Sequence, residues 1–153
     1  MALYLVQHGK ANPRERDVEP RLSEEGKRET RLVAEEAKRQ GLKVRRIEHS
    51  GKARSKETAE IFASLLKPEG GLHERPGIQP LDDVAPQPAL LKSDDELMLV
   101  GHLPFLEKLA ALLITGSAEP MVIKFQNAGL VCLDQVPDTG RWFIKWTLMS
   151  SLK

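Results

Sequence analysis

Short apolar runs alternate along the chain with segments of helical periodicity. Residues 2–6 and 97–100 are continuously apolar, a pattern typical of strands buried on both faces of a parallel sheet. Residues 44–50 predict a further strand. Each predicted strand ends at polar residues: Gln7-His8, Ser50 and Gly101-His102.

Three helices are predicted between and after these strands. Ser23 is a suitable N-cap for the first helix, and Gly41 stands where a C-terminal glycine is expected. A second helix runs from about Lys52 to Leu66. A third begins at Pro104, a residue that fits the first turn of a helix, and extends through Leu113.

The remaining segments predict a loop and a set of closing strands. Residues 68–88 contain five prolines and three glycines, which favours a loop with one short extended piece near residues 78–81. Further strands are predicted near residues 121–125, 130–134 and 142–149, and the alternation in the last indicates a half-exposed strand.

This order of elements predicts a three-layer α/β/α fold with a mostly parallel sheet and helices on both faces. The chain has 153 residues, shows no internal repeat or linker, and is expected to form one domain over residues 1–153. In such folds ligands bind at the carboxyl ends of the strands. The polar residues at those ends are therefore expected to converge.

Composition narrows the classes of partner. The net charge of +1 gives no reason to expect nucleic acid or a membrane surface. No apolar run approaches the ~20 residues needed to span a bilayer, and residues 1–6 lack the basic region of a signal peptide. Cys132 is the only cysteine and is expected in the core, so the chain is predicted to be cytoplasmic.

Two histidines share the same context. One apolar strand leads into His8-Gly9 and another into Gly101-His102, each beside a glycine that permits close approach of the backbone. A single histidine at a strand end is more often structural than catalytic. The repetition favours a functional pair, and the histidines show no metal-binding spacing.

Four segments together resemble the histidine phosphatase superfamily, which has a phosphoglycerate mutase-like fold. Leu5-Val6-Gln7-His8-Gly9 resembles the Arg-His-Gly signature of that family. The other three segments are Leu22–Gly26, Ser50–Ala59 and Leu99–Pro104, which resemble its Leu-Thr-x-x-Gly, Ser-x-x-x-Arg-Ala-x-Gln-Thr-Ala and Val-Gly-His-x-Pro motifs. The short length is similar to that of the SixA-type phosphohistidine phosphatases.

The resemblance implies a role for each matching residue. His8 would attack phosphorus and form a covalent phosphohistidine, with its other ring nitrogen donating to a backbone oxygen in the following loop. Arg54 would clamp the phosphate oxygens, and His102 would neutralise charge on the transferring group. No metal or other cofactor is implied.

The chain departs from the family at position 7, where Gln7 replaces arginine. Gln7 keeps a hydrogen-bond donor, but the lost charge is worth ~1.5–3 kcal/mol of phosphate binding. Lys10 is a candidate to restore the charge, although a solvated lysine is the more ordinary role. Ser50 and Lys52 are further candidates for phosphate contact, with a surface role equally open.

The proton donor is a second open question. Asp83 lies in the interval where larger family members carry an acid, but SixA-type members lack a clear counterpart, and we expect none here. An imidazole leaving group is assisted by its own protonation. We therefore expect a protein phosphohistidine as substrate. A small phosphorylated metabolite, and a non-catalytic phosphate-recognition module suggested by Gln7, remain the alternatives.

Overall fold

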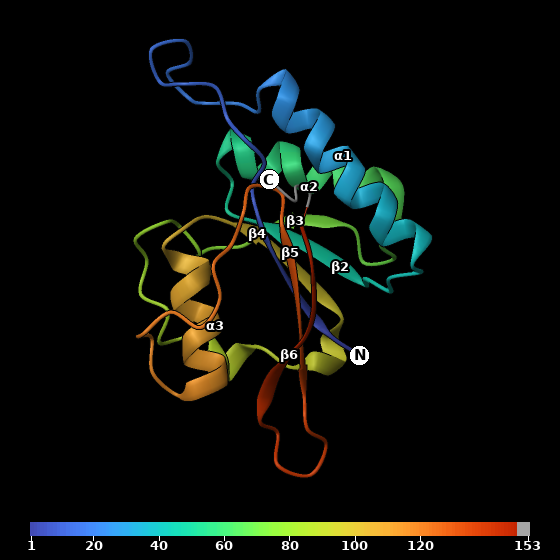
Figure 1. The fold of residues 1–153 in the computed structure, drawn as a ribbon, viewed down its shortest axis with the longest axis vertical. Coiled ribbons are helices and arrows are strands. Elements are labelled where there is room, and N and C mark those ends of the chain that lie inside the picture. The colour runs from blue at the N-terminus through green and yellow to red at the C-terminus, as the bar shows by residue number, and fades with distance from the viewer. Residues whose placement is uncertain (150–153) are drawn as a thin grey trace.

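The computed structural model describes residues 1–149 and contains a six-stranded sheet with helices on both faces (Figure 1). The strands lie in the order β3-β2-β4-β1-β5-β6. The first four are parallel, whereas β5 runs antiparallel to β1, and β6 antiparallel to β5. Their bounds are β1 Leu3–Gln7, β2 Arg46–His49, β3 Leu72–Glu74, β4 Leu97–Gly101, β5 Leu130–Gln135 and β6 Trp142–Leu148.

The helices divide between the two faces of the sheet, which confirms the predicted three-layer α/β/α fold. Two short 3₁₀ helices, η1 and η2, precede β4. Figure 1 shows α1 and α2 on one side and α3 on the other. Within residues 1–149, none of the helices is long and apolar enough to cross a membrane. The bounds are α1 Glu24–Arg39, α2 Ala53–Leu66, α3 Phe105–Thr115, η1 Pro88–Leu90 and η2 Ser93–Asp95.

Strand β1 shows why its sequence is continuously apolar. Leu3 and Leu5 pack into the core on the α3 face, while Tyr4 and Val6 pack into the core on the face of α1 and α2. Successive side chains of a strand point to opposite faces, so a strand covered on both sides needs an apolar residue at every position. Leu3, Leu5 and Val6 are fully buried. The chain direction of β1 therefore fixes where Gln7 and His8 emerge from the core.

The caps of α1 match the sequence prediction. The Ser23 hydroxyl accepts a hydrogen bond from the Gly26 N–H at 3.0 Å, which satisfies one of the free donors of the first turn. At the other end, Gly41 has φ of 72°, a left-handed conformation that glycine adopts at little cost. β2, Arg46–His49, lies within the strand predicted for residues 44–50, and α2 begins one residue after the predicted start at Lys52.

Two predictions about the strands are wrong. Residues 121–125 form no strand; the backbone N–H of Phe125 instead donates to the Glu107 carboxylate of α3 at 3.4 Å. The extended piece of the Pro-rich segment lies at β3, residues 72–74, and not near residues 78–81. Ile78 is buried in the core as part of a loop. Ile78 and Phe125 are buried in the core that includes α3, whereas Met121 and Val122 are exposed, so the apolar character of these segments did not specify strand pairing.

Candidate active site

The carboxyl ends of three adjacent parallel strands carry the polar residues that the sequence singled out. β1 and β4 pair so that Gln7 lies opposite Gly101, and His8 and His102 are the next residues on each. The centroids of the two imidazole rings are 5.2 Å apart. Ser50 follows β2, and its Oγ lies 2.6 Å from Nε2 of His102. These three side chains therefore meet at one edge of the sheet, where ligands bind in this type of fold.

Hydrogen bonds of the neighbouring Gly9 backbone fix the position of His8. Its Nδ1 lies 2.6 Å from the Gly9 carbonyl oxygen, the backbone contact that the sequence analysis expected. The Gly9 N–H donates to Thr58 Oγ1 at 2.9 Å. A Cβ on Gly9 would stand 2.5 Å from Thr30 Oγ1, so this position requires glycine. With Nδ1–H donating to Gly9, Nε2 of the half-buried imidazole keeps a free lone pair.

His102 is almost completely buried, with 1% of its surface exposed. Nε2 contacts Ser50 Oγ, which in turn lies 2.6 Å from Ser55 Oγ. Within residues 1–149, Nδ1 is buried and has no hydrogen-bond partner. An unpartnered buried ring nitrogen is costly, and an oxyanion bound in the crevice would satisfy it.

The electrostatic setting of both imidazoles favours their neutral forms. Burial, and then the charges of His8, Arg54 and Lys52, lower the pKa of His102 to about 3. Burial also lowers the pKa of His8, and the charge of Arg54 adds to this, while the hydrogen bond to Gly9 opposes it. A neutral His8 is the nucleophilic form, and a site this positive is suited to a bound anion.

Arg54 is the second residue of α2, and its guanidinium is half-buried beside these rings. Within residues 1–149 its side chain makes no hydrogen bond or ion pair with the protein. Burial lowers its pKa, and Arg14 adds to this effect, whereas Glu19 opposes it. Glu19 is held at the same helix end, because its carboxylate accepts the Ala53 N–H at 2.9 Å. An unpaired guanidinium at this place leaves its planar donor fork free for a ligand.

A family model described as the histidine phosphatase superfamily (branch 1) matches residues 3–79, which include His8 and Arg54. The chain belongs to the histidine phosphatase superfamily. No curated protein matches it.

Solved structures of histidine phosphatases share the fold over nearly the whole chain. The protein histidine phosphatase SixA in complex with tungstate superposes with a TM-score of 0.83 at 24% identity, covering 98% of this chain and 97% of that chain. A putative phosphohistidine phosphatase SixA from Agrobacterium tumefaciens gives 0.76 at 25% identity, with 96% of each chain covered. A mycobacterial glucosyl-3-phosphoglycerate phosphatase complexed with VO3 gives 0.72 at 14% identity, covering 95% and 97%.

Gln7, which stands where the histidine phosphatase motif has arginine, lies at the edge of the same crevice. Its backbone N–H donates to the Gly129 carbonyl at 3.2 Å, so β1 holds it in place. Its side chain is half-buried. Within the described part of the chain, Oε1 is buried without a hydrogen-bond partner. The position is therefore neutral, and it offers a carboxamide where the family motif offers a cation.

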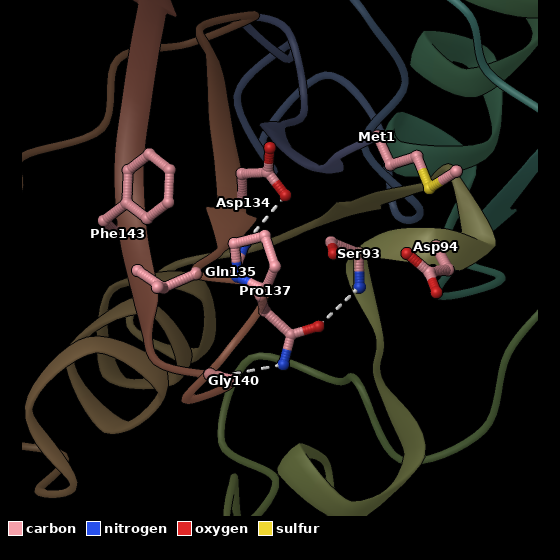
Figure 2. Close-up of a pocket in the computed structure, with 9 residues that line it drawn as sticks. Met1, Ser93, Asp94, Asp134, Gln135, Pro137, Gly140 and Phe143 are labelled. Carbon is pink, nitrogen blue, oxygen red and sulfur yellow. Dashed lines mark hydrogen bonds between the residues drawn. The ribbon is translucent and has the colours of Figure 1, made fainter.

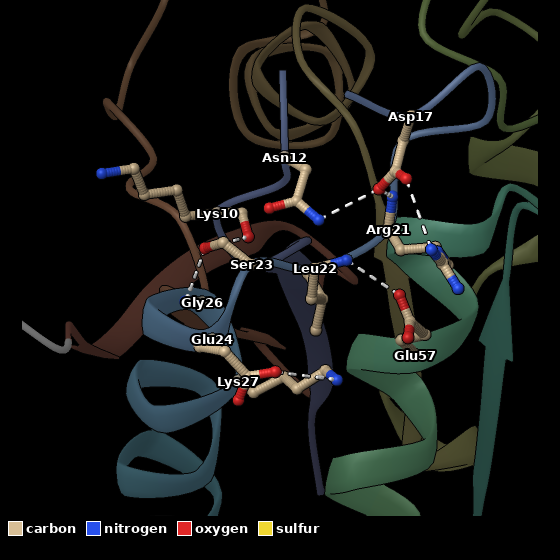
Figure 3. Close-up of polar contacts among 10 residues, drawn as sticks. All are labelled: Lys10, Asn12, Asp17, Arg21, Leu22, Ser23, Glu24, Gly26, Lys27 and Glu57. Atoms are coloured by element: carbon tan, nitrogen blue, oxygen red, sulfur yellow. Dashed lines mark hydrogen bonds and ion pairs between the residues drawn. The ribbon is translucent and has the colours of Figure 1, made fainter. Parts of the chain in front are cut away.

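Lys10 is engaged elsewhere in this histidine phosphatase. Its Nζ pairs with the Glu25 carboxylate at 2.8 Å, and both side chains are about half exposed. Figure 3 shows its ammonium directed away from the polar cluster of Asn12, Asp17 and Arg21. This ion pair supports the surface role for Lys10 rather than a contact with phosphate.

Asp83 has a structural role in the loop that follows β3. It is exposed, and its Oδ1 accepts the Ala85 N–H at 3.0 Å. The neighbouring Asp82 accepts the Gln79 N–H at 2.8 Å, and Gln79 Nε2 donates to the Ser50 carbonyl at 2.6 Å. The two aspartates therefore shape the loop beside Ser50.

Sequence reasoning missed three supporting residues. Ser55 and Thr58 lie within the recognised motif, but nothing in the sequence showed that their hydroxyls contact Ser50 and Gly9. Asn127, whose Nδ2 donates to the His8 carbonyl at 3.2 Å, is 119 residues away and has no local signal. The only sequence signal for these residues was their position within a family motif, and only Ser55 and Thr58 have such a position.

Figure 3 shows how the loop between β1 and α1 is braced near the site. Asp17 accepts hydrogen bonds from Asn12 at 3.0 Å and from Arg21 at 3.3 Å. The Leu22 N–H donates to the Glu57 carboxylate of α2 at 2.8 Å. These contacts join the loop to the helix that carries Arg54.

A cavity of about 640 Å³ lies at the opposite end of the sheet (Figure 2). Met1, before β1, and Gln135, at the end of antiparallel β5, both line it. The candidate active-site residues His8, Arg54 and His102 do not line it. Within residues 1–149, no group of three or more His, Cys, Asp or Glu side chains is arranged to hold a metal ion.

Proposed function

We propose that this chain hydrolyses protein phosphohistidine through a covalent phosphohistidine formed on His8. The observation that carries the proposal is the meeting of two neutral imidazoles near an unpaired guanidinium. His8 is the nucleophile, Arg54 the phosphate clamp and His102 the electrostatic partner. Gln7 and Ser50 assist, Gln7 as a phosphate donor and Ser50 by fixing the ring of His102.

The first step transfers the phosphoryl group to His8. Nε2 forms a bond to phosphorus while the bond between phosphorus and the substrate nitrogen breaks, and the departing imidazole takes up a proton from solvent. Nδ1–H stays bonded to the Gly9 carbonyl, which stabilises the positive charge that His8 gains. Arg54 and the Nδ1–H of the neutral His102 donate hydrogen bonds to the phosphoryl oxygens as charge develops on them, with His102 Nε2 accepting from the Ser50 hydroxyl.

In the second step water attacks phosphorus and the bond to Nε2 breaks. Inorganic phosphate leaves and His8 returns to its neutral form. Bound phosphate raises the pKa of His102 relative to the empty site, because an anion beside the ring favours the charged imidazolium. His102 thereby shuttles the proton that water loses.

The substrate class follows from the leaving group. Asp82 and Asp83 accept hydrogen bonds within their loop, and we assign neither of them as an acid that protonates an alkoxide. Imidazole leaves without such help. The connection from β3 to β4, residues 75–96, is too small to form a large lid, which suits a histidine presented by another protein. The A. tumefaciens neighbour is described as a putative phosphohistidine phosphatase. We therefore propose that the chain acts in phosphorelay signalling, as a single domain that needs no metal. The proposed location is the cytoplasm, where the thiol of Cys132 stays reduced.

Mass spectrometry tests the mechanism. The protein is mixed with a phosphohistidine protein, quenched without acid and digested. We expect a phosphate label on His8 in the wild type and in His73→Ala, a variant at an exposed histidine, and no label in His8→Ala. A wild type that binds phosphate without label or turnover would instead identify a phosphate-recognition module.

A substrate panel tests the specificity. We expect turnover of the phosphohistidine protein and little turnover of alkyl phosphomonoesters. Preference for a small phosphomonoester would favour a metabolite phosphatase, the activity named for the mycobacterial neighbour.

A further inference from the structure

The candidate phosphate site lacks the cation that its family motif places next to the nucleophile, because Gln7 is neutral. We propose that Lys52 binds the phosphate and supplies the positive charge that position 7 lacks. This inference rests on the proposed function only in so far as the crevice of His8, Arg54 and His102 is the phosphate site.

The position of Lys52 in the chain brings its main chain close to His102. It is the N-cap residue of α2, in an extended conformation with φ of −68° and ψ of 144°. Its backbone N–H donates to Ser50 Oγ at 3.4 Å, and that oxygen lies 2.6 Å from Nε2 of His102. The main chain of Lys52 is thus two hydrogen bonds away from the ring of His102.

The Lys52 side chain is half-buried and available. It makes no capping hydrogen bond, and within residues 1–149 it has no ion pair. Two other lysines in the N-terminal part of the chain have carboxylate partners, since Lys10 pairs with Glu25 and Lys27 with Glu24. A half-buried ammonium without a carboxylate is the form in which lysine binds phosphate as a point charge.

The charges around His102 support the same placement. The charged groups that act on its ring are His8, Arg54 and Lys52, and all three disfavour protonation. Lys56, one turn further along α2, acts on His49 instead, and it is exposed. The two lysines of this helix end therefore face different surroundings, which makes Lys56 a matched control.

Calorimetric titration of the full chain with inorganic phosphate tests the proposal. We expect Lys52→Met to weaken phosphate binding about tenfold, the loss of one charge-assisted contact, and Lys56→Met to leave it within about twofold. In a Gln7→Arg background, which restores the family cation, Lys52→Met should cost less than about threefold. Such non-additivity is what two groups serving one role produce.

Three results would overturn the proposal. These are unchanged phosphate affinity in Lys52→Met, an equal loss in Lys56→Met, or the same tenfold loss in both backgrounds at position 7. Thermal melts of each variant identify any loss that comes from unfolding. Because the titration requires no turnover, a chain that binds phosphate through Lys52 but never labels His8 would refute the proposed function and leave this inference standing.

Discussion

The two imidazoles of the site are supported in different ways. His8 has a backbone acceptor for Nδ1, whereas Nδ1 of the more deeply buried His102 has no partner within residues 1–149. A buried polar atom left without a partner destabilises the fold by about 1–3 kcal/mol. The unsatisfied Nδ1 of His102 therefore marks the place where a bound phosphoryl oxygen restores the missing hydrogen bond.

The low pKa of His102 predicts a pH-dependent contribution to stability. The folded-state pKa of about 3 lies below the ordinary value of 6.5, so the unfolded state binds the proton more readily between these pH values. The contribution of His102 is complete above pH 6.5 and is lost as the pH falls toward 3. Urea unfolding at pH 7 and at pH 4.5 measures how much the free energy of unfolding falls between these pH values. This fall should be about 2 kcal/mol smaller in His102→Asn than in the wild type.

An equal fall in the free energy of unfolding in the wild type and in His102→Asn would contradict this prediction. His73→Asn is the control, because His73 is exposed and its Nε2 contacts only the Gly70 carbonyl among the described residues. That variant should retain the wild-type loss between the two pH values.

Thr58 gives a second prediction at the residue scale. Its buried hydroxyl accepts the Gly9 N–H and donates to the Arg54 carbonyl, so it joins the His8 loop to α2. Thr58→Val leaves the Gly9 N–H unpartnered and should lower the free energy of unfolding by about 1–3 kcal/mol. Thr58→Ser keeps the hydroxyl and should restore both stability and the rate of His8 labelling. A serine variant as slow as the valine variant would exclude this role.

At the scale of elements, the site depends on how the loop between β1 and α1 packs on the first turn of α1. A Cβ on Gly26 would stand 2.1 Å from the Lys10 carbonyl oxygen, so the backbone of the loop lies directly against this helix. The Lys10 carbonyl also accepts the Ser23 N–H at 2.9 Å. Since Lys10 follows His8 by two residues, the position of α1 constrains the nucleophile loop.

Gly26→Ala tests that constraint. The clash involves backbone atoms and cannot be relieved by a side-chain rotation, so the loop must shift and stability should fall by about 2–4 kcal/mol. Gly41→Ala is the comparison, because that site is open but has φ of 72°, and it should cost only about 1 kcal/mol. Thermal melts measure both values, and His8 labelling should slow only in Gly26→Ala. Equal behaviour of the two variants would show that the contact does not position the loop.

The elements differ in how far the sequence predicted them. β1 and β4 could be predicted from their own residues, because burial on both faces of the sheet favours a continuous apolar run. β3 has only three residues, all partly exposed, and exists because Leu72 pairs with Ile47 of β2. Residues 121–125 pair with no strand, because the Phe125 N–H donates to Glu107 of α3, and Met121 and Val122 are exposed. Strand pairing depends on segments that lie far away in the chain, which a local apolar pattern does not specify.

The same distinction applies to the site. The backbone acceptor of His8 followed from its chemistry, since an attacking imidazole needs a fixed tautomer. The contacts of Thr58 and Asn127 depend on where the loops fold, and the pairing of Lys10 with Glu25 depends on the first turn of α1. Sequence spacing holds no information on these distances.

For the whole molecule, the fold separates two regions with different properties. His8, Arg54 and His102 gather at the carboxyl ends of the parallel strands, where positive groups outnumber their carboxylate partners. The cavity of Figure 2 lies at the other end, and Asp94 and Asp134 line it. Charge alone therefore predicts which end of the molecule accepts a phosphate.

Ligand-linked stability distinguishes the two regions in one measurement. Phosphate that binds only the folded state at about 100 times its dissociation constant adds about 2.7 kcal/mol, which raises the Tm of a chain of this size by several degrees. We expect this rise in the wild type and in Asp94→Asn, an exposed position of the cavity, and its loss in Arg54→Met and His102→Asn. If the rise persisted undiminished in both Arg54→Met and His102→Asn, the phosphate would bind elsewhere on the molecule. The carboxyl ends of the strands would then lose their assignment as the active site, because a phosphatase must hold the phosphoryl group where its nucleophile stands.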